Sequence, residues 1–292
     1  MLCDNRLPRY LPHIGHPEVL LMGLSPLGSR LWIETDDDLP QYHAHKLRQR
    51  ERYQDRVYRA LPSSLAAQQE LSALLLDHLL TSQSDLYSKE GNNLRCSPGQ
   101  LLCPLEAQEP LWNCSLWVAD DLVIMQEREE EYLLTAASLA SPSDWRLEEK
   151  FGLPLRAIHD PIPYFHRELT PAIDRFFKHL RPEHPVVRFN WSLQAHSNLS
   201  QRPEHVSAIE PDTELFYRTE RQSLMRLPQT GAIAFTIRVY LHPLRSLEHT
   251  AGALAALFAA IDATHPALAH YKGFDALAAP LVKYRGMADA SR

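Results

Sequence analysis

A histidine that stands just before two closely spaced prolines is the residue in this chain best suited to chemistry. His159 precedes Pro161 and Pro163, whose rings restrict the backbone and would orient the imidazole. A neutral imidazole nitrogen binds iron well, so the functional interpretation is an axial metal ligand. The alternative is a turn histidine fixed between constrained residues. His196, at the end of a predicted strand, is the rival ligand, and the residues alone leave both positions open.

A second group of candidates lies on two predicted strands and just after them. Its members are Asn190, Trp191, Arg218, Glu220, Arg221 and Arg226. Arginine forks bind carboxylates, so this group could bind haem propionates or an acidic substrate. The alternative is the exposed polar face of a sheet that is covered on one side only.

The predicted elements that position these residues are strands and helices in a definite order. Apolar residues at helical spacing predict helices over 62–81 and from Thr170 to Pro182, and an Ala/Leu-rich helix from Thr250 to about Pro266. A short helix is predicted around 145–151. Strands are predicted over 122–126, 132–137, 187–193, 214–222 and 232–241, the first two joined by the charged connection 127–131.

This order predicts an α+β fold with a PAS-like antiparallel sheet. Two strands, a helical crossover and three more strands would form the sheet, flanked by N- and C-terminal helices. His159 falls in the crossover. We expect an N-terminal helical and loop cap over 1–110, with turns over 85–110. The PAS-like core would span 111–245, and a C-terminal helix with a polar tail 246–292.

The composition excludes several classes of function. A net charge of -6 with interspersed acids and bases does not resemble a basic nucleic-acid footprint. We expect no membrane span, since no apolar run is long enough, and a cytoplasmic location. The cysteines form no CxxC pair, which argues against zinc or iron–sulfur ligation by this chain. The pair His43 and His45 could bind a metal if it lay on a strand, although the following charged run favours a solvated helix.

Several segments together resemble the haem-dependent oxidative N-demethylase family, the group of dimethylamine monooxygenase catalytic subunits. They span roughly 115–245 and comprise the segments 145–155, 158–163, 190–193, 217–228 and 231–238. Each piece is weak alone, and the combination is fairly specific. The chain differs from the family pattern at Asp160, at Tyr164 and Phe165, and at Arg128, differences that concern the substrate more than the haem.

The resemblance implies a PAS-like fold that binds haem b and oxidises a small secondary or tertiary methylamine, such as dimethylamine, with O2. It implies His159 as the axial ligand, with His196 as the rival. Separate reductase chains would supply electrons through flavin and an iron–sulfur centre, and tetrahydrofolate would capture the formaldehyde equivalent.

The remaining candidate residues have hypothetical roles in this reaction. Arg218, Arg221 and Arg226 would bind propionates or an acidic cofactor. Glu220 would hold an amine cation or relay protons, and Asn190 and Trp191 would line the pocket. The alternatives are a non-catalytic PAS-like haem or small-ligand sensor and a subunit that serves assembly alone.

Overall fold

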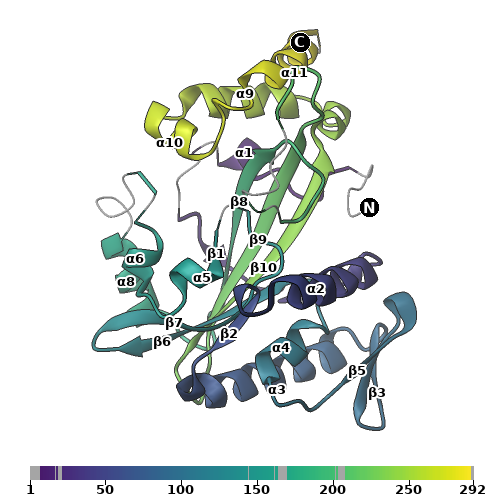
Figure 1. Cartoon of the computed structure of the whole chain (residues 1–292), viewed down its shortest axis with the longest axis vertical. Helices are drawn as coiled ribbons and strands as arrows, with labels where there is room; N and C mark the ends of the chain where they lie inside the picture. The colour runs from purple at the N-terminus through teal and green to yellow at the C-terminus, as the bar shows by residue number, and fades with distance from the viewer. Residues whose placement is uncertain are drawn as a thin grey trace.

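An antiparallel seven-stranded sheet runs through the centre of the molecule, with helices packed around it (Figure 1). The structure is a computed structural model. It describes residues 7–16, 18, 22–143, 145–160, 162–163, 170–200, 202 and 208–290. The mixture of helices and antiparallel sheet confirms the predicted α+β class.

The sheet has the spatial order β1-β8-β9-β10-β6-β7-β2. Its strands are β1 (Ser25–Pro26), β2 (Tyr58–Ala60), β6 (Asp121–Arg128), β7 (Glu131–Ser138), β8 (Val186–Gln194), β9 (Phe216–Arg226) and β10 (Ile233–Pro243). The five predicted strands are therefore present as β6 to β10. Of these five strands, β6 and β7 come first in the chain and form a hairpin, and the last strand, β10, pairs with β6. The short strands β1 and β2 add N-terminal residues to the two edges.

The crossover between β7 and β8 contains short helices. Those described are α5 (Leu147–Lys150), α6 (Leu155–Ile158) and α8 (Thr170–His179). Helix α8 has the predicted spacing of apolar residues, and Phe177, with Leu180 just beyond the helix, is buried. Asp144, Pro161, Tyr164 and Phe165 lie outside the described residues.

The N-terminal part of the chain contains more sheet than the sequence indicated. Its helices are α1 (Pro12–Gly15), α2 (Leu39–Tyr53), α3 (Leu65–Ser82) and α4 (Pro110–Ser115), with 3₁₀ turns at Gln54–Arg56, Pro62–Ser64 and Pro98–Gln100. The predicted turns of 85–110 are only part of that region, which also forms a second antiparallel sheet of β3 (Tyr87–Glu90), β4 (Asn93–Cys96) and β5 (Leu101–Pro104).

The pair His43 and His45 lies on helix α2, so the strand interpretation was wrong. Each ring contacts a backbone carbonyl, that of Leu116 for His43 and that of Ala140 for His45. These contacts explain both histidines as structural residues of a helix packed against the sheet.

The C-terminal part is helical almost to its end, which corrects the predicted polar tail. The 3₁₀ helix η5 (Leu244–His249) is followed by α9 (Ala253–Ala263), α10 (Pro266–Tyr271) and α11 (Ala278–Ala290). Helix α11 buries Leu281 and Tyr284. Its exposed side carries Val282 together with Lys283 and Arg285, so no clear apolar pattern marks this helix in the sequence.

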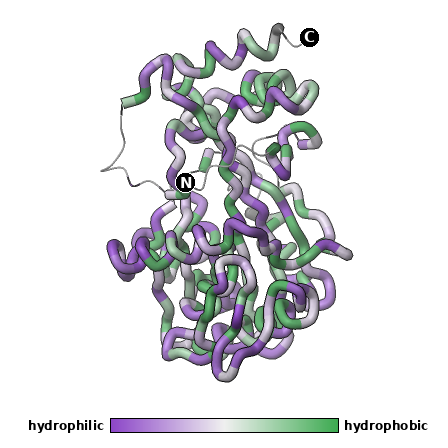
Figure 2. The backbone as a smooth tube through the Cα atoms, turned by 90° about the vertical axis from the view of Figure 1, so that its right-hand side faces the viewer, coloured by the Kyte–Doolittle hydropathy of each residue, from purple (hydrophilic) through white to green (hydrophobic). Residues whose placement is uncertain are grey.

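Both faces of the sheet are covered, so the core has more than one layer. On β6, Leu122 and Ile124 pack with the N-terminal helices, whereas Val123 and Met125 pack with the crossover. A further cluster joins the far ends of β8 and β9 to the C-terminal helices. Hydrophobic and hydrophilic residues mix along the chain in all these layers (Figure 2). Within the described ranges, no helix is long and apolar enough to cross a membrane.

Candidate functional site

His159 caps the C-terminus of α6 in the crossover, as its place in the sequence predicted. Its Nδ1 lies 2.9 Å from the carbonyl oxygen of Leu155. A carbonyl can only accept, so Nδ1 carries the proton and Nε2 carries the lone pair. In metal-binding histidines, the ring nitrogen that does not bind the metal typically donates such a hydrogen bond, which fixes the tautomer. The preceding residue, Ile158, is buried in the crossover core and anchors this turn.

His196 follows the end of β8 and has the opposite tautomer. The side-chain nitrogen of Gln194 lies 3.0 Å from His196 Nδ1 and also donates to the carbonyls of His196 and Asn198. An amide nitrogen cannot accept, so the Nδ1 of His196 is the unprotonated nitrogen and faces a donor. The Nδ1 lone pair thus points at an amide group whose two N–H groups are shared among three acceptors.

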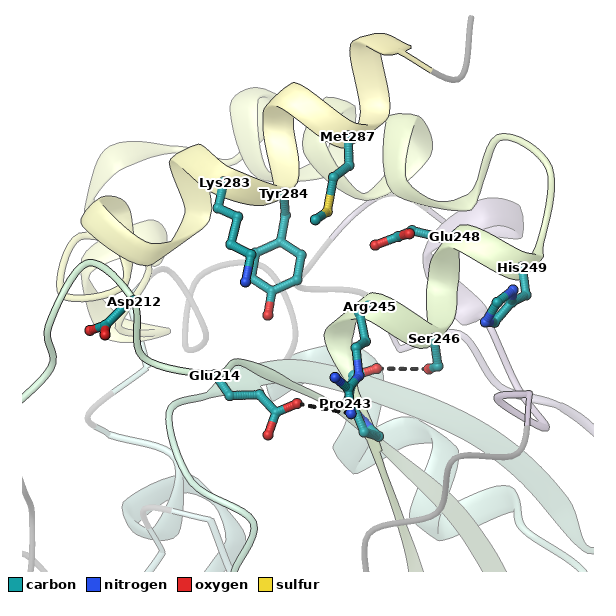
Figure 3. A pocket seen from close by; sticks show the side chains of 10 residues that line it. All are labelled: Asp212, Glu214, Pro243, Arg245, Ser246, Glu248, His249, Lys283, Tyr284 and Met287. Atoms are coloured by element: carbon teal, nitrogen blue, oxygen red, sulfur yellow. Dashed lines mark hydrogen bonds and ion pairs between the residues drawn. The ribbon is translucent and has the colours of Figure 1, made fainter.

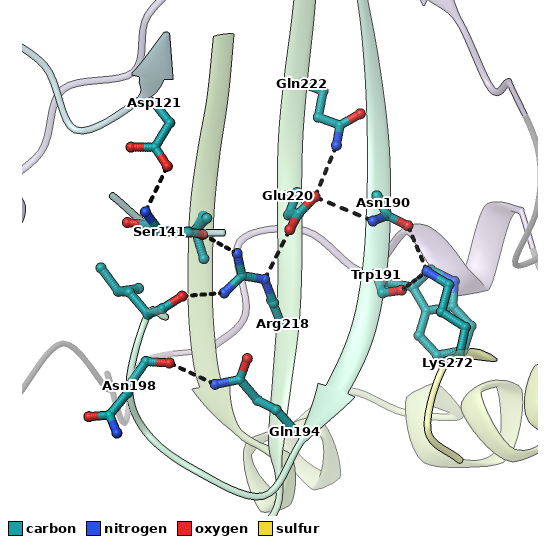
Figure 4. A network of polar contacts seen from close by, with 12 residues as sticks. Asp121, Ser141, Asn190, Trp191, Gln194, Asn198, Arg218, Glu220, Gln222 and Lys272 are labelled. Carbon is teal, nitrogen blue, oxygen red and sulfur yellow. Dashed lines mark hydrogen bonds and ion pairs between the residues drawn. The ribbon is translucent and has the colours of Figure 1, made fainter. Parts of the chain in front are cut away.

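Arg218 and Glu220 form a buried ion pair on one face of β9 (Figure 4). The Nε of Arg218 donates to Oε1 of Glu220 over 3.0 Å. The other two nitrogens of Arg218 donate to the backbone carbonyls of Ser141 and Leu199. The sheet therefore brings together an arginine and a carboxylate that are two residues apart, because alternate residues of a strand share a face.

Asn190 joins this cluster from the neighbouring strand. It lies directly opposite Glu220 in the β8–β9 register, and its side-chain nitrogen donates to Oε2 of Glu220 over 3.3 Å. Gln222 donates to the same oxygen over 2.9 Å. Lys272, from just beyond α10, donates to Oδ1 of Asn190 over 3.1 Å and extends the network to the C-terminal helices (Figure 4).

The cluster keeps Glu220 ionised. Burial opposes ionisation, but the charge and hydrogen bond of Arg218, the hydrogen bond of Asn190 and the charge of Lys272 together lower the pKa of Glu220 below its usual value. A carboxylate has about four acceptor positions. The donors from Arg218, Asn190 and Gln222 leave room for one more N–H or O–H group at Glu220.

Arg221 lies on the opposite face of β9 from this cluster. Its Nε is 3.3 Å from Oε1 of Glu34, and its terminal nitrogens donate to the carbonyls of Leu31 and Trp32. Arg221 thus holds the N-terminal segment against the sheet. The structure does not bring it together with Glu220.

Arg226 lies at the far end of β9, where it joins the crossover to a turn. It donates to the carbonyls of Phe177 and Leu180 at the end of α8, to that of Gly231, and to the hydroxyl of Tyr132. These contacts connect α8 with the β9–β10 turn and with β7. Arg226 is therefore separated along the strand from the cluster of Arg218 and Glu220.

Trp191 follows Asn190 and points to the other face of β8. It is buried and stacks on Phe274, with ring centroids 5.8 Å apart. Its neighbours are the C-terminal helices and α1 instead of the crossover. The predicted site residues thus divide between two faces of the sheet, with Asn190, Arg218 and Glu220 on one face and Trp191 and Arg221 on the other.

Two residues of the cluster were missed as site candidates by the sequence argument. For Gln222, its alternation with Glu220 along the predicted strand was the available signal. Lys272 belongs to the segment predicted as a polar tail, and no local pattern marks it. Only the packing of the C-terminal helices brings Lys272 to Asn190, 82 residues earlier.

A separate surface pocket of about 620 Å³ lies between the end of β10, η5 and α11 (Figure 3). It is lined by Asp212, Glu214, Pro243, Arg245, Ser246, Glu248, His249, Lys283, Tyr284 and Met287. The predicted site residues are not part of this lining. The charged groups partly neutralise one another, as in the pair of Glu214 and Arg245 at 3.6 Å.

The described residues contain no group of three or more His, Cys, Asp or Glu side chains that could hold a metal ion. Cys96, Cys103 and Cys114 are buried free thiols, and burial raises the pKa of each. Cys3 lies outside the described residues. A single histidine could still hold the iron of a porphyrin, because the porphyrin itself would supply most of the ligands.

Comparison with known families gives one match that covers most of the chain. The family described as haem-dependent oxidative N-demethylase, alpha subunit-like, matches residues 23–282. The match includes the crossover with His159, all of β6 to β10, and Lys272.

Proposed function

The chain belongs to the haem-dependent oxidative N-demethylase, alpha subunit-like family, and on this basis we propose that it binds haem b through His159 and oxidises a small methylated amine. The observation that carries the proposal is the hydrogen bond from His159 Nδ1 to the carbonyl of Leu155. It directs the lone pair to Nε2, the nitrogen that would bind iron. The preceding residue, Ile158, belongs to an apolar cluster of the crossover that also contains Phe177, and such a cluster would suit the rim of a porphyrin.

His159 is the better ligand of the two histidines. The Nδ1 of His196 faces an amide donor, so iron binding there would cost this contact. Binding through Nε2 of His196 would require the other tautomer, in which two N–H donors face each other. At His159 the hydrogen bond to Leu155 already sets the tautomer that has its lone pair on Nε2.

Glu220 is the proposed anchor for the amine. A methylated amine is a cation near neutral pH, and the ionised Glu220 carboxylate has an acceptor position left for its N–H group. Asn190 and Gln222 hold the carboxylate in place. Bound haem would supply the activation of O2, while Glu220 would orient the amine and carry a proton to or from it.

Arg218 is the arginine we propose for a haem propionate. It shares a face of β9 with Glu220, and three of its five N–H groups are used in the contacts described above. Arg221 and Arg226 hold other parts of the chain together, and we propose structural roles for both. Trp191, on the other face of β8, would help to hold its neighbour Asn190 in place.

Electrons and the one-carbon product require partners. We propose that separate reductase subunits carrying flavin and an iron–sulfur centre deliver the electrons, and that tetrahydrofolate takes the formaldehyde equivalent. The resemblance to the family supports these partners, and the words "alpha subunit-like" in its description agree with a multi-subunit enzyme.

The proposal is tested by amine-dependent consumption of O2 with an artificial electron donor. We expect dimethylamine or a related methylamine to stimulate the rate in the haem-loaded protein. Glu220→Gln should retain haem and lower kcat/KM for the amine by about tenfold or more, the scale of one buried charged contact. Glu106→Gln, at an exposed position, is the matched control and should behave as the wild type.

Two outcomes would contradict this function. A protein that binds haem but shows no amine-dependent uptake with any methylamine would be a haem sensor. A protein that stays colourless after haem supplementation, and whose melting temperature no methylamine shifts, would serve assembly alone.

A further inference from the structure

Tyr217 and His13 form an isolated hydrogen-bonded pair behind the candidate site. The hydroxyl oxygen of Tyr217 lies 2.7 Å from His13 Nδ1, and both residues are almost completely buried. The two are 204 residues apart in the sequence, and helix α1 places the histidine against β9. Burial raises the pKa of Tyr217 far above its usual value, so the phenol does not ionise by itself.

The second nitrogen of His13 determines the direction of the proton in this pair. His13 Nε2 lies 3.0 Å from the carbonyl of Ala253, and only an N–H can donate to a carbonyl. The neutral ring therefore has its lone pair on Nδ1, where it accepts the proton of Tyr217. Burial lowers the pKa of His13, so the resting ring is neutral and its Nδ1 is unprotonated.

Several other tyrosines of the protein donate to oxygen atoms instead of to an imidazole. Tyr42 donates to the carbonyl of Val239 over 2.6 Å, and Tyr87 to that of Trp117 over 2.8 Å. Tyr240 and the half-buried Tyr10 donate to the carboxyl oxygens of Glu34. Among these five tyrosines, Tyr217 is the one whose hydroxyl has an imidazole partner.

The pair is also connected to the candidate site through an aromatic stack. Trp191 stacks on Tyr217 with ring centroids 6.3 Å apart and an interplanar angle of 25°. Trp191 directly follows Asn190, whose side chain reaches Glu220 on the other face of β8. An oxidising equivalent formed on the Glu220 face would therefore meet Trp191 and then Tyr217.

We propose that Tyr217 and His13 are a redox-active pair, in which Tyr217 gives one electron to a one-electron oxidant while its proton moves to His13. The O–H bond of Tyr217 breaks, an N–H bond forms at Nδ1 of His13, and the oxidant is reduced by one electron. The products are a neutral tyrosyl radical and an imidazolium, and a one-electron reductant reverses the step. A role of the pair as an outlet for unused oxidising equivalents of a bound haem rests on the proposed function. The redox step between Tyr217 and His13 does not depend on that function.

The test supplies the oxidant from outside. The full-length purified protein is illuminated with ruthenium tris-bipyridyl and persulfate, frozen, and examined by electron paramagnetic resonance. We expect a tyrosyl radical in the wild type, loss of most of its signal in Tyr217→Phe, and a several-fold lower yield in His13→Gln. Tyr42→Phe, which removes a buried hydroxyl bonded to a carbonyl, is the matched control and should keep the signal.

A measurement on the unaltered chain covers the case in which the variants misfold. Labelling histidine with ¹⁵N should change the electron–nuclear double resonance spectrum of the radical, because His13 stays hydrogen-bonded to the tyrosyl oxygen. A radical without histidine coupling, or an equal signal in Tyr217→Phe, would overturn the proposal. Because the oxidant is external, failure here is distinguishable from failure to bind haem or to oxidise an amine.

Discussion

At the scale of single residues, the two buried carboxyl groups Glu220 and Asp120 differ mainly in the hydrogen bonds that their neighbours donate to them. Glu220 has donors from Arg218, Asn190 and Gln222, and its pKa falls. Asp120 is also fully buried, yet neither of its carboxylate oxygens makes a hydrogen bond to the described residues. Burial raises the pKa of Asp120 to about 6, although Arg238, Arg221 and Lys46 oppose the shift.

We expect Asp120→Asn to stabilise the protein above pH 6. Between the ordinary value near 4 and the folded value of about 6, the folded chain holds a proton that the unfolded chain releases. Stability is therefore lost as the pH rises through this window, and the loss persists above it. Asparagine has no such proton, so the variant should gain about 1–3 kcal/mol at pH 7.5.

Urea unfolding at several pH values measures this effect. The difference between the variant and the wild type should shrink towards pH 4, where Asp120 is protonated in the folded state. A variant that is less stable than the wild type at pH 7.5 would show that Asp120 is ionised there and well solvated or paired.

At the scale of elements, helix α2 contacts the part of β10 that extends beyond its pairing with β6. Tyr42 donates to the carbonyl of Val239 on β10. Lys46, one turn later and fully buried, donates from Nζ to the carbonyls of Ser115, Val118 and Asp120. Three carbonyl groups of the segment that connects α4 with β6 are thus satisfied by one ammonium group, and this contact fixes α2 on the sheet.

Lys46→Met should cost about 2–4 kcal/mol of unfolding free energy. The methionine fills the space but leaves the buried carbonyls without their donor. Arg48→Met, at an exposed position of the same helix, should change stability by less than about 0.5 kcal/mol. Thermal and urea unfolding of both variants provide the comparison, and equal stabilities would contradict the role of Lys46.

The elements that the sequence predicted well are those with strong local periodicity. The strands β8 and β10 alternate, α3 and α8 repeat apolar residues at helical spacing, and the charged connection of β6 and β7 forms the predicted hairpin. The short strands β3 to β5 were missed because their pairing depends on contacts between neighbours, which a turn-rich composition hides. Helix α11 was missed because its buried residues are few.

The site was predictable only where it is local. Arg218 and Glu220 share a face because strand alternation requires it, and the crossover position of His159 follows from the order of elements. Asn190 lies beside Glu220 through the register of β8 and β9, which the sequence alone does not set. The separation of Arg221 onto the other face also follows from alternation. Lys272 and His13 could not be predicted, since their partners are 82 and 204 residues away and only tertiary packing brings them together.

At the scale of the whole molecule, three groups of helices cover one sheet. The crossover helices, the N-terminal helices and the C-terminal helices each have a hydrophobic cluster against the strands. The C-terminal group also contacts the candidate site through Lys272. The site therefore depends on a layer whose sequence lies outside the predicted PAS-like core.

Removal of α11 should destabilise the molecule beyond the loss of a terminal tail. A chain that ends after Leu277 lacks the buried Leu281 and Tyr284, whose hydroxyl accepts from the backbone of Leu215 just before β9. We expect a melting temperature lower by several degrees, since burial of each large side chain is worth about 1.5–3 kcal/mol, with increased binding of a hydrophobic dye. An unchanged melting temperature would mean that α11 adds little to the core.

The absorption spectrum of the haem-loaded protein tests the central claim, iron ligation by His159, most directly. The wild type and His196→Ala should both show the Soret band of a histidine-ligated haem, because His196 contacts Gln194 and is not the proposed ligand. His159→Ala should lose that band, and added imidazole should restore it in part. A Soret band that survives in His159→Ala and disappears in His196→Ala would contradict the assignment and move the iron to the end of β8.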